Sequence, residues 1–138
     1  MHNIAELLGA IAGDGHIDYK KRYRETTIYK LTFSGNFSED LDYYKKIRIF
    51  VKKSFSKKLN FHRQRENELI ANIYSKKLVE HLISLGAIDG NKSKKIEIPK
   101  WLNKKQKLYF IRGLFDTDGS VTFKKKYKGA WDVTWIGM

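Results

Sequence analysis

Apolar side chains recur at helical spacing in two segments, one near each end of the chain. The first covers residues 4–11 and the second residues 110–115, and in both the apolar positions lie three or four residues apart. An Asp-Gly pair follows each segment, Asp14-Gly15 after the first and Asp118-Gly119 after the second. Glycine often takes a left-handed conformation just after a helix. The pattern therefore predicts two helices, each ending at an acid and a left-handed glycine.

Alternating apolar and polar residues elsewhere predict three hairpins. Their strands are expected at residues 16–22 and 26–34, at residues 58–65 and 69–74, and at residues 120–123 and 131–136. A basic turn at residues 20–24 joins the first pair of strands, and a turn at residues 66–68 joins the second pair.

Two further helices are predicted between the hairpins, over residues 38–54 and 75–85. Ser38 and Ser75 are expected to cap them, because a serine hydroxyl accepts hydrogen bonds from the free amides of a first turn. Gly86 is expected to end the second of these helices. The resulting order, α-β-β-α-β-β-α followed by the start of a second such series, predicts an α+β fold.

The two terminal helices are also similar in sequence. Residues 7–15 and 111–119 match at Gly9 with Gly113 and at both residues of the final Asp-Gly pair. An internal repeat of this kind implies two equivalent structural units, with one site shared between them.

Small residues mark one face of each repeated helix. Gly9 and Gly13 are four residues apart, and Gly113 and Thr117 hold the matching positions in the second copy. A glycine inside a helix lowers its stability by about 1 kcal/mol relative to alanine, so the pair needs a reason. Small residues at this spacing let two helices come into close contact. We therefore expect the two helices to pack through these faces.

Both repeated helices place an acid at the carboxyl end. That end carries partial negative charge and favours basic residues, so Asp14 and Asp118 are locally unfavourable. If the helices pack as expected, the two carboxylates lie side by side and would bind a divalent metal ion. Asp-Gly is also a common way for a chain to leave a helix, which is the plainer explanation of either pair taken alone.

The composition points to an anionic partner. The chain has 28 Lys and Arg against 15 Asp and Glu, a formal net charge of +13, which suits the phosphate backbone of DNA or RNA. It has no cysteine, which excludes disulfides and thiolate metal sites, and its four histidines lack the spacing of a zinc site. No apolar segment is long enough to cross a membrane and no signal peptide is seen, so we expect a cytoplasmic or organellar protein.

The repeated segments resemble the LAGLIDADG motif of a family of homing endonucleases, which also includes intein-borne nucleases and RNA maturases. The sequences Leu-Leu-Gly-Ala-Ile-Ala-Gly-Asp-Gly at residues 7–15 and Ile-Arg-Gly-Leu-Phe-Asp-Thr-Asp-Gly at residues 111–119 fill the motif. Residues 84–87, 90–95 and 98–99 also resemble the family. The likeness therefore covers nearly the whole chain.

The resemblance implies an αββαββα unit whose curved four-stranded antiparallel sheet forms a saddle over double-stranded DNA. It implies a first domain at residues 1–103, followed at residues 104–138 by the motif helix and partial hairpin of a second, incomplete domain. Asp14 and Asp118 would bind Mg²⁺ near the scissile phosphates, where the metal promotes hydrolysis of phosphodiester bonds.

The resemblance also implies two further catalytic residues. Lys92 lies in a basic loop where relatives carry an active-site lysine, although by position Lys94 or Lys95 could replace it. Asn36 follows the second predicted strand, where relatives place a polar residue that positions solvent. Most lysines in a chain of this charge are simply solvated.

Alternation along the predicted strands separates an apolar face, suited to packing on helices, from a basic or polar face. Ordinary solvation explains such a face, and contact with the major groove of DNA is the functional alternative. The residues expected to contact DNA are His16, Asp18, Lys20, Arg22, Arg24, Lys30, Thr32, Asn60, His62, Arg63 and Arg65.

Only residues 120–138 follow the second motif, which is room for one hairpin but not for a second αββαββα unit. Three hypotheses therefore stay open. The first is a truncated homing endonuclease, and the second is a relic or maturase-like protein that binds DNA or RNA without cutting it. The third is self-association through the apolar surface of the incomplete unit. An intein is disfavoured, because the chain has no nucleophilic first residue and no terminal His-Asn pair.

Overall fold

The structure, a computed structural model, describes residues 1–88, 95–96, 98–117, 121–125 and 131–135 of the chain. Its helices are α1 (Ile4–Asp14), α2 (Phe37–Phe55), α3 (Lys76–Ser84) and α4 (Lys104–Thr117). Its strands are β1 (Gly15–Tyr23), β2 (Thr26–Asn36), β3 (Asn60–Gln64), β4 (Glu68–Tyr74), β5 (Lys95–Ile96), β6 (Val121–Lys125) and β7 (Trp131–Trp135). Among the described residues, no helix has the length and apolar character of a membrane span.

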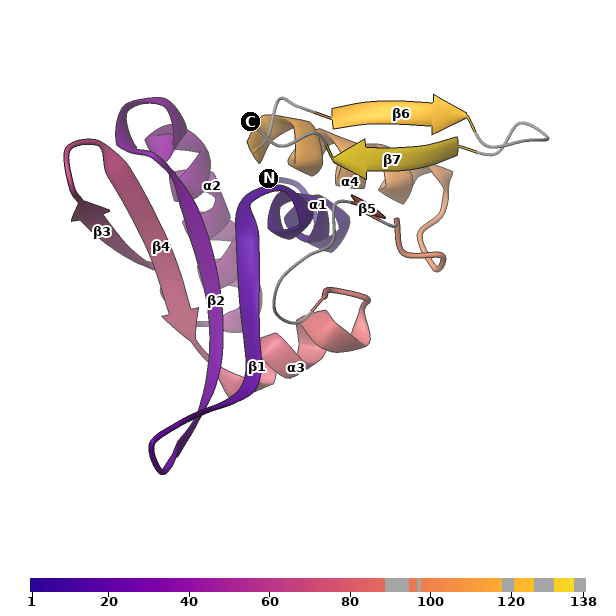
Figure 1. The fold of residues 1–138 in the computed structure, drawn as a ribbon. Coiled ribbons are helices and arrows are strands. Elements are labelled where there is room, and N and C mark those ends of the chain that lie inside the picture. Colours follow the sequence, from indigo (N-terminus) through magenta and orange to yellow (C-terminus); the bar gives the residue numbers. More distant parts are fainter. Residues whose placement is uncertain (89–94, 97, 118–120, 126–130, 136–138) are drawn as a thin grey trace.

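Strands β1 to β4 form an antiparallel sheet in the order β1-β2-β4-β3 (Figure 1). One face of this sheet is apolar, and α1, α2 and α3 contact it. Its buried side chains include Ile17, Leu31, Phe33 and Leu69. The predicted α+β fold with a four-stranded antiparallel sheet is confirmed.

Helices α1 and α4 lie side by side (Figure 1) and pack where their sequences carry glycine. A Cβ atom at Gly9 would overlap the carbonyl oxygen of Phe110, and one at Gly113 would overlap the carbonyl oxygen of Glu6. The two helix backbones are in direct contact because no side chain separates them at these positions.

The start of α2 differs from the predicted one. Asn36, and not Ser38, is the N-cap, because its Oδ1 accepts a hydrogen bond from the Glu39 amide at 3.0 Å. The Ser38 hydroxyl instead donates to Oδ1 of Asn67 at 3.0 Å. The helix therefore begins at Phe37, and the prediction of a Ser38 cap was wrong.

The ends of α3 agree with the sequence, whereas the end of α1 does not. Ser75 caps α3 by accepting a hydrogen bond from the Leu78 amide at 3.1 Å, and Gly86 follows the helix with a φ of 107°. Gly15 was expected to be left-handed, but its φ is −88°. Glycine is required there for space instead, since a Cβ atom would lie 2.6 Å from Cα of Ile11.

A second antiparallel sheet has the order β5-β7-β6. Strands β6 and β7 form the hairpin expected after the second motif. Strand β5 was not predicted, because two residues are too few to show alternation. It pairs with β7 through Lys95 opposite Thr134, so the segment before α4 and the segment after it share one sheet.

Replacing Gly9 by alanine tests the contact between α1 and α4. Helix propensity alone would make this change stabilising by about 1 kcal/mol. We expect a loss of about 1–3 kcal/mol instead, because the new methyl group must displace the Phe110 backbone. Urea unfolding followed by circular dichroism measures the change, and a gain in stability would show that the helices do not touch at Gly9.

Candidate functional site

Asp14 ends α1 at the point where the chain enters β1. Its Oδ2 accepts a hydrogen bond from the hydroxyl of Tyr44, in α2, at 3.4 Å. Tyr44 is fully buried, and this burial, together with the nearby carboxylates of Asp14 and Asp40, raises the pKa of its hydroxyl well above the ordinary value. Tyr44 is therefore a protonated donor to Asp14.

The carboxyl ends of α1 and α4 meet beside Asp14. A Cβ atom at Gly13 would overlap Oγ1 of Thr117, the last residue of α4. The Thr117 hydroxyl donates to the carbonyl oxygen of Gly113 at 2.9 Å, within its own helix. Asp118 comes next but lies outside the described residues, so its pairing with Asp14 stays a prediction.

Asp14 supplies the kind of ligand that Mg²⁺ prefers, a hard carboxylate oxygen. In the described ranges, no group of three or more His, Cys, Asp or Glu residues is arranged to hold a metal ion. A metal ion on Asp14 would therefore need further oxygen ligands from Asp118, backbone carbonyls, water or a bound phosphate. The donor chemistry of Asp14 fits this role.

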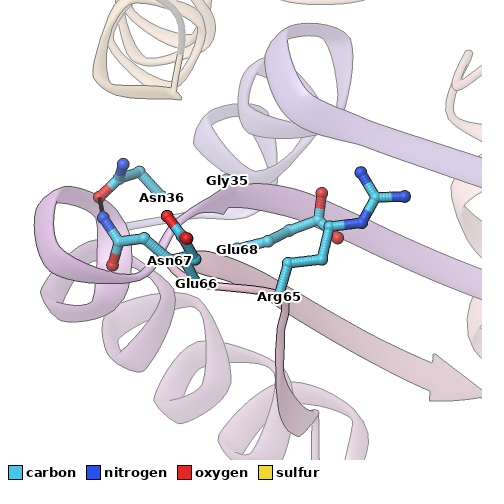
Figure 2. Close-up of a pocket in the computed structure, with 6 residues that line it drawn as sticks. All are labelled: Gly35, Asn36, Arg65, Glu66, Asn67 and Glu68. Atoms are coloured by element: carbon cyan, nitrogen blue, oxygen red, sulfur yellow. Dashed lines mark hydrogen bonds between the residues drawn. The ribbon is translucent and has the colours of Figure 1, made fainter.

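Asn36 lies in an open depression of about 600 Å³ between the end of β2 and the β3–β4 turn (Figure 2). Its Oδ1 accepts hydrogen bonds from the Glu39 amide at 3.0 Å and from Nδ2 of Asn67 at 2.9 Å. Figure 2 shows the Asn36–Asn67 pair at one end of the depression and the Arg65 guanidinium at the other. Since the oxygen caps α2, only the amide nitrogen of Asn36 is suited to the predicted role of positioning solvent.

The predicted active-site lysine cannot be placed in the same way. Lys92 and its substitute Lys94 lie outside the described residues, and Lys95 is described only by its backbone in β5. The assignment of an active-site lysine therefore stays a prediction.

The face of the first sheet opposite the helices is polar, and its side chains line up across the strands. Thr32 lies opposite both His16 and Asn72, and Asn72 lies opposite Asn60. The residues expected to contact DNA that lie on this face are His16, Asp18, Lys30, Thr32, Asn60 and His62.

A β-bulge changes which later side chains of β1 reach this polar face. The register shifts just before Lys21, and Lys20 has a φ of 55°. Lys21 then lies opposite Ile28, on the polar face, whereas Arg22 lies opposite Thr27, on the other face. The expected alternation through Lys20 and Arg22 is therefore wrong, because one extra residue reverses the sides.

The remaining predicted arginines do not lie within the polar face. Arg63 lies opposite Leu69, on the helix side, where its guanidinium is 4.4 Å from the ring centre of Phe37. Its placement on the DNA-facing side was wrong. Arg24 and Arg65 are exposed residues with positive φ in the turns of the two hairpins, at 58° and 51°.

Charges on the polar face are partly paired. Asp18 is buried, with Oδ1 3.2 Å from Nε2 of His16 and 3.7 Å from Nζ of Lys21. Nζ of Lys30 lies 5.5 Å from the ring centre of Tyr74. Asp18 therefore lies beside His16 and Lys21 on the polar face.

Strand β4 supplies residues to the polar face that the sequence analysis missed. Ile70, Asn72 and Tyr74 lie opposite residues of β2 that belong to this face. The signal was present in the sequence, because Leu69, Ala71 and Ile73 are apolar at alternate positions and the residues between them must then point the other way. Lys21 was missed for a different reason, since no residue pattern announced the bulge.

Known families and proteins resemble this chain over different stretches of its sequence. A family model described as a LAGLIDADG-like domain matches residues 105–135, which span most of α4 and the hairpin after it. In sequence, the replication factor C small subunit of Methanocaldococcus jannaschii is 32% identical over an alignment of 128 residues, and the match covers 89% of this chain. The chain spans only 7% of the length of that curated relative.

Two solved structures share the fold over most of the chain. A variant of I-DmoI in complex with nicked target DNA and manganese has a TM-score of 0.65 at 16% identity, covering 94% of this chain and 86% of that one. I-AabMI, a LAGLIDADG meganuclease bound to uncleaved DNA, has a TM-score of 0.54 at 13% identity, covering 95% of this chain and 64% of that one.

The fold is thus that of the LAGLIDADG homing endonucleases, an α+β unit in which a motif helix leads into a four-stranded antiparallel sheet. The matching family model covers the second motif itself. Together they confirm the resemblance of this chain to the LAGLIDADG homing endonuclease family.

The buried hydroxyl of Tyr44 predicts a loss of stability at alkaline pH. Its pKa is higher in the folded protein than the value of about 10 expected in the unfolded chain. The stabilisation is therefore complete below about pH 10 and is lost above it, where the unfolded chain releases the proton first. We expect the free energy of unfolding in urea to fall less steeply above pH 10 in Tyr44→Phe than in the parent chain. If the free energy of unfolding fell equally steeply with pH in both proteins, the raised pKa would not belong to Tyr44.

Proposed function

We propose that this chain acts as a metal-dependent endonuclease that binds double-stranded DNA on the polar face of its first sheet. The observation that carries the proposal is the meeting of the two motif helices at Gly13 and Thr117, each one residue before a motif aspartate. The fold shared with I-DmoI and I-AabMI, whose structures contain DNA, supports the same reading.

The proposed metal site consists of Asp14 and Asp118, and Mg²⁺ is the proposed ion. Structures of I-DmoI with DNA and manganese, magnesium or calcium support a divalent ion in proteins of this fold. When bound, such an ion activates water and stabilises the leaving oxygen of a phosphodiester. In this chain, the Asp14 carboxylate would hold the ion, the Asn36 amide nitrogen would orient solvent, and Lys92 would neutralise charge on the phosphate.

DNA binding is proposed to depend on the strands and on the overall charge. The net charge of +13 favours association with a phosphate backbone over a long range. On the polar face, Lys21 and Lys30 supply charge, while Asn60 and Asn72 supply amide groups that suit the edge of adenine.

The alternative is a protein that binds DNA or RNA without cutting it. The net charge of +13 suits this alternative equally well, because it attracts a phosphate backbone whether or not the strand is then cut. Salt-sensitive binding without metal-dependent nicking of a selected target would favour this alternative. Self-association through the second sheet remains a separate proposal.

Replacing Asp14 by asparagine tests the catalytic proposal. The change removes a charged metal ligand while keeping the size of the side chain, so Mg²⁺-dependent nicking of a selected duplex should be lost. Asp116→Asn is the matched control, because Asp116 is an exposed acid of α4 whose Oδ2 lies 3.9 Å from Nε of Arg112. Cleavage that survives Asp14→Asn would exclude Asp14 from the reaction.

Replacing Lys30 by alanine tests the DNA surface. We expect weaker binding to a fluorescent duplex, and a slope of log Kd against log salt that is smaller by about 1, since one phosphate contact is lost. Lys45→Ala carries the same charge change on an exposed position of α2, which packs on the other face of the sheet. Equal effects of the two substitutions would show that the polar face is not the binding surface.

A further inference from the structure

Tyr44 connects α2 to the proposed metal ligand in α1. Its ring is buried against Phe33, with ring centres 5.8 Å apart, and its hydroxyl lies 3.4 Å from Oδ2 of Asp14. A buried ring has little freedom to move, because packing in a protein core restricts side chains to one arrangement. The hydroxyl is therefore held at a defined point beside Asp14.

Gly35 provides the space for this hydroxyl. A Cβ atom at Gly35 would lie 2.6 Å from the Tyr44 oxygen and 2.5 Å from Oδ2 of Asp40. Asp40 is itself fixed, since the same oxygen accepts a hydrogen bond from the backbone N–H of Asn36 at 2.7 Å. The Tyr44 hydroxyl has one proton to donate, and the observed hydrogen bond gives it to Asp14.

The neighbouring tyrosine provides a contrast. Tyr43 also points to α1, but its hydroxyl lies 3.5 Å from Oε2 of Glu6, in the first turn of that helix. Successive tyrosines of α2 therefore reach opposite ends of α1, and only Tyr44 reaches the end that carries Asp14.

We propose that Tyr44 is a positioning residue that orients the Asp14 carboxylate for metal binding. The inference rests on the proposed function, since it requires Asp14 to be a metal ligand. A donor to a ligating carboxylate fixes its orientation, and loss of such a donor typically weakens metal affinity about 10- to 100-fold. Tyr44 would thus act on the metal through Asp14 and without touching the ion.

The experiment is a titration of the full chain with Mn²⁺ alone, in which free Mn²⁺ is measured by electron paramagnetic resonance. The proteins are the parent chain, Tyr44→Phe, Tyr43→Phe and Asp14→Asn. We expect Asp14→Asn to lose the site, Tyr44→Phe to weaken it by about 10-fold, and Tyr43→Phe to leave it unchanged. Tyr43→Phe controls for the loss of a partly buried, hydrogen-bonded hydroxyl from α2.

The outcomes separate the inference from the proposed function. If Asp14→Asn binds Mn²⁺ like the parent chain, Asp14 is not a ligand and both fail. If Asp14→Asn loses the site but Tyr44→Phe binds normally, only the role of Tyr44 is overturned. Equal weakening by Tyr43→Phe and Tyr44→Phe also overturns it, because the effect is then one of general stability.

A second variant covers the case in which Tyr44→Phe folds poorly. Gly35→Ala keeps the hydroxyl but forces it away from its place beside Asp14. We expect weaker Mn²⁺ binding in this variant as well. Parent-like affinity in Gly35→Ala would overturn the inference.

Discussion

Direct backbone contact between α1 and α4 is the constraint on which the rest of the structure depends. Gly9 and Gly113 each face a carbonyl oxygen of the opposite helix, and any side chain there would push the two axes apart. The contact at Gly13 and Thr117 would open with them. Helix stability is reduced by each glycine, and this is offset by dispersion contacts along the whole interface. The position of Asp14 is therefore set by packing several residues away from it.

Much of this arrangement could be predicted from local patterns. Helical periodicity located α1 and α4, and small residues four apart identified the faces through which they pack. Alternation likewise located the four strands of the first sheet to within a few residues. These signals are readable because each depends on residues close together in the sequence. The final Asp118-Gly119 of the second motif copy and most of the lysine loop lie outside the described residues.

Other features have no local signal. The bulge at Lys20 uses a positive φ at a residue that is not glycine, so nothing in the sequence marks the point at which the strand reverses its two faces. Asn36 and Ser38 are both good caps, and the choice depends on Asn67, which arrives from the distant β3–β4 turn. The hydrogen bond from Tyr44 to Asp14 joins residues 30 apart in the chain. Each outcome is decided by tertiary contact, which a single sequence does not display.

The pairing of β5 with β7 joins segments on the two sides of the predicted border at Lys104. Helix α4 is entered from β5 and left through β6 and β7, and all three strands belong to one sheet. The segments before and after the second motif helix are therefore joined by the pairing of β5 with β7. A border drawn at Lys104 would separate these two strands. For anyone exchanging halves between proteins of this kind, a joint at Lys104 would place β5 and its partner β7 in different parent proteins.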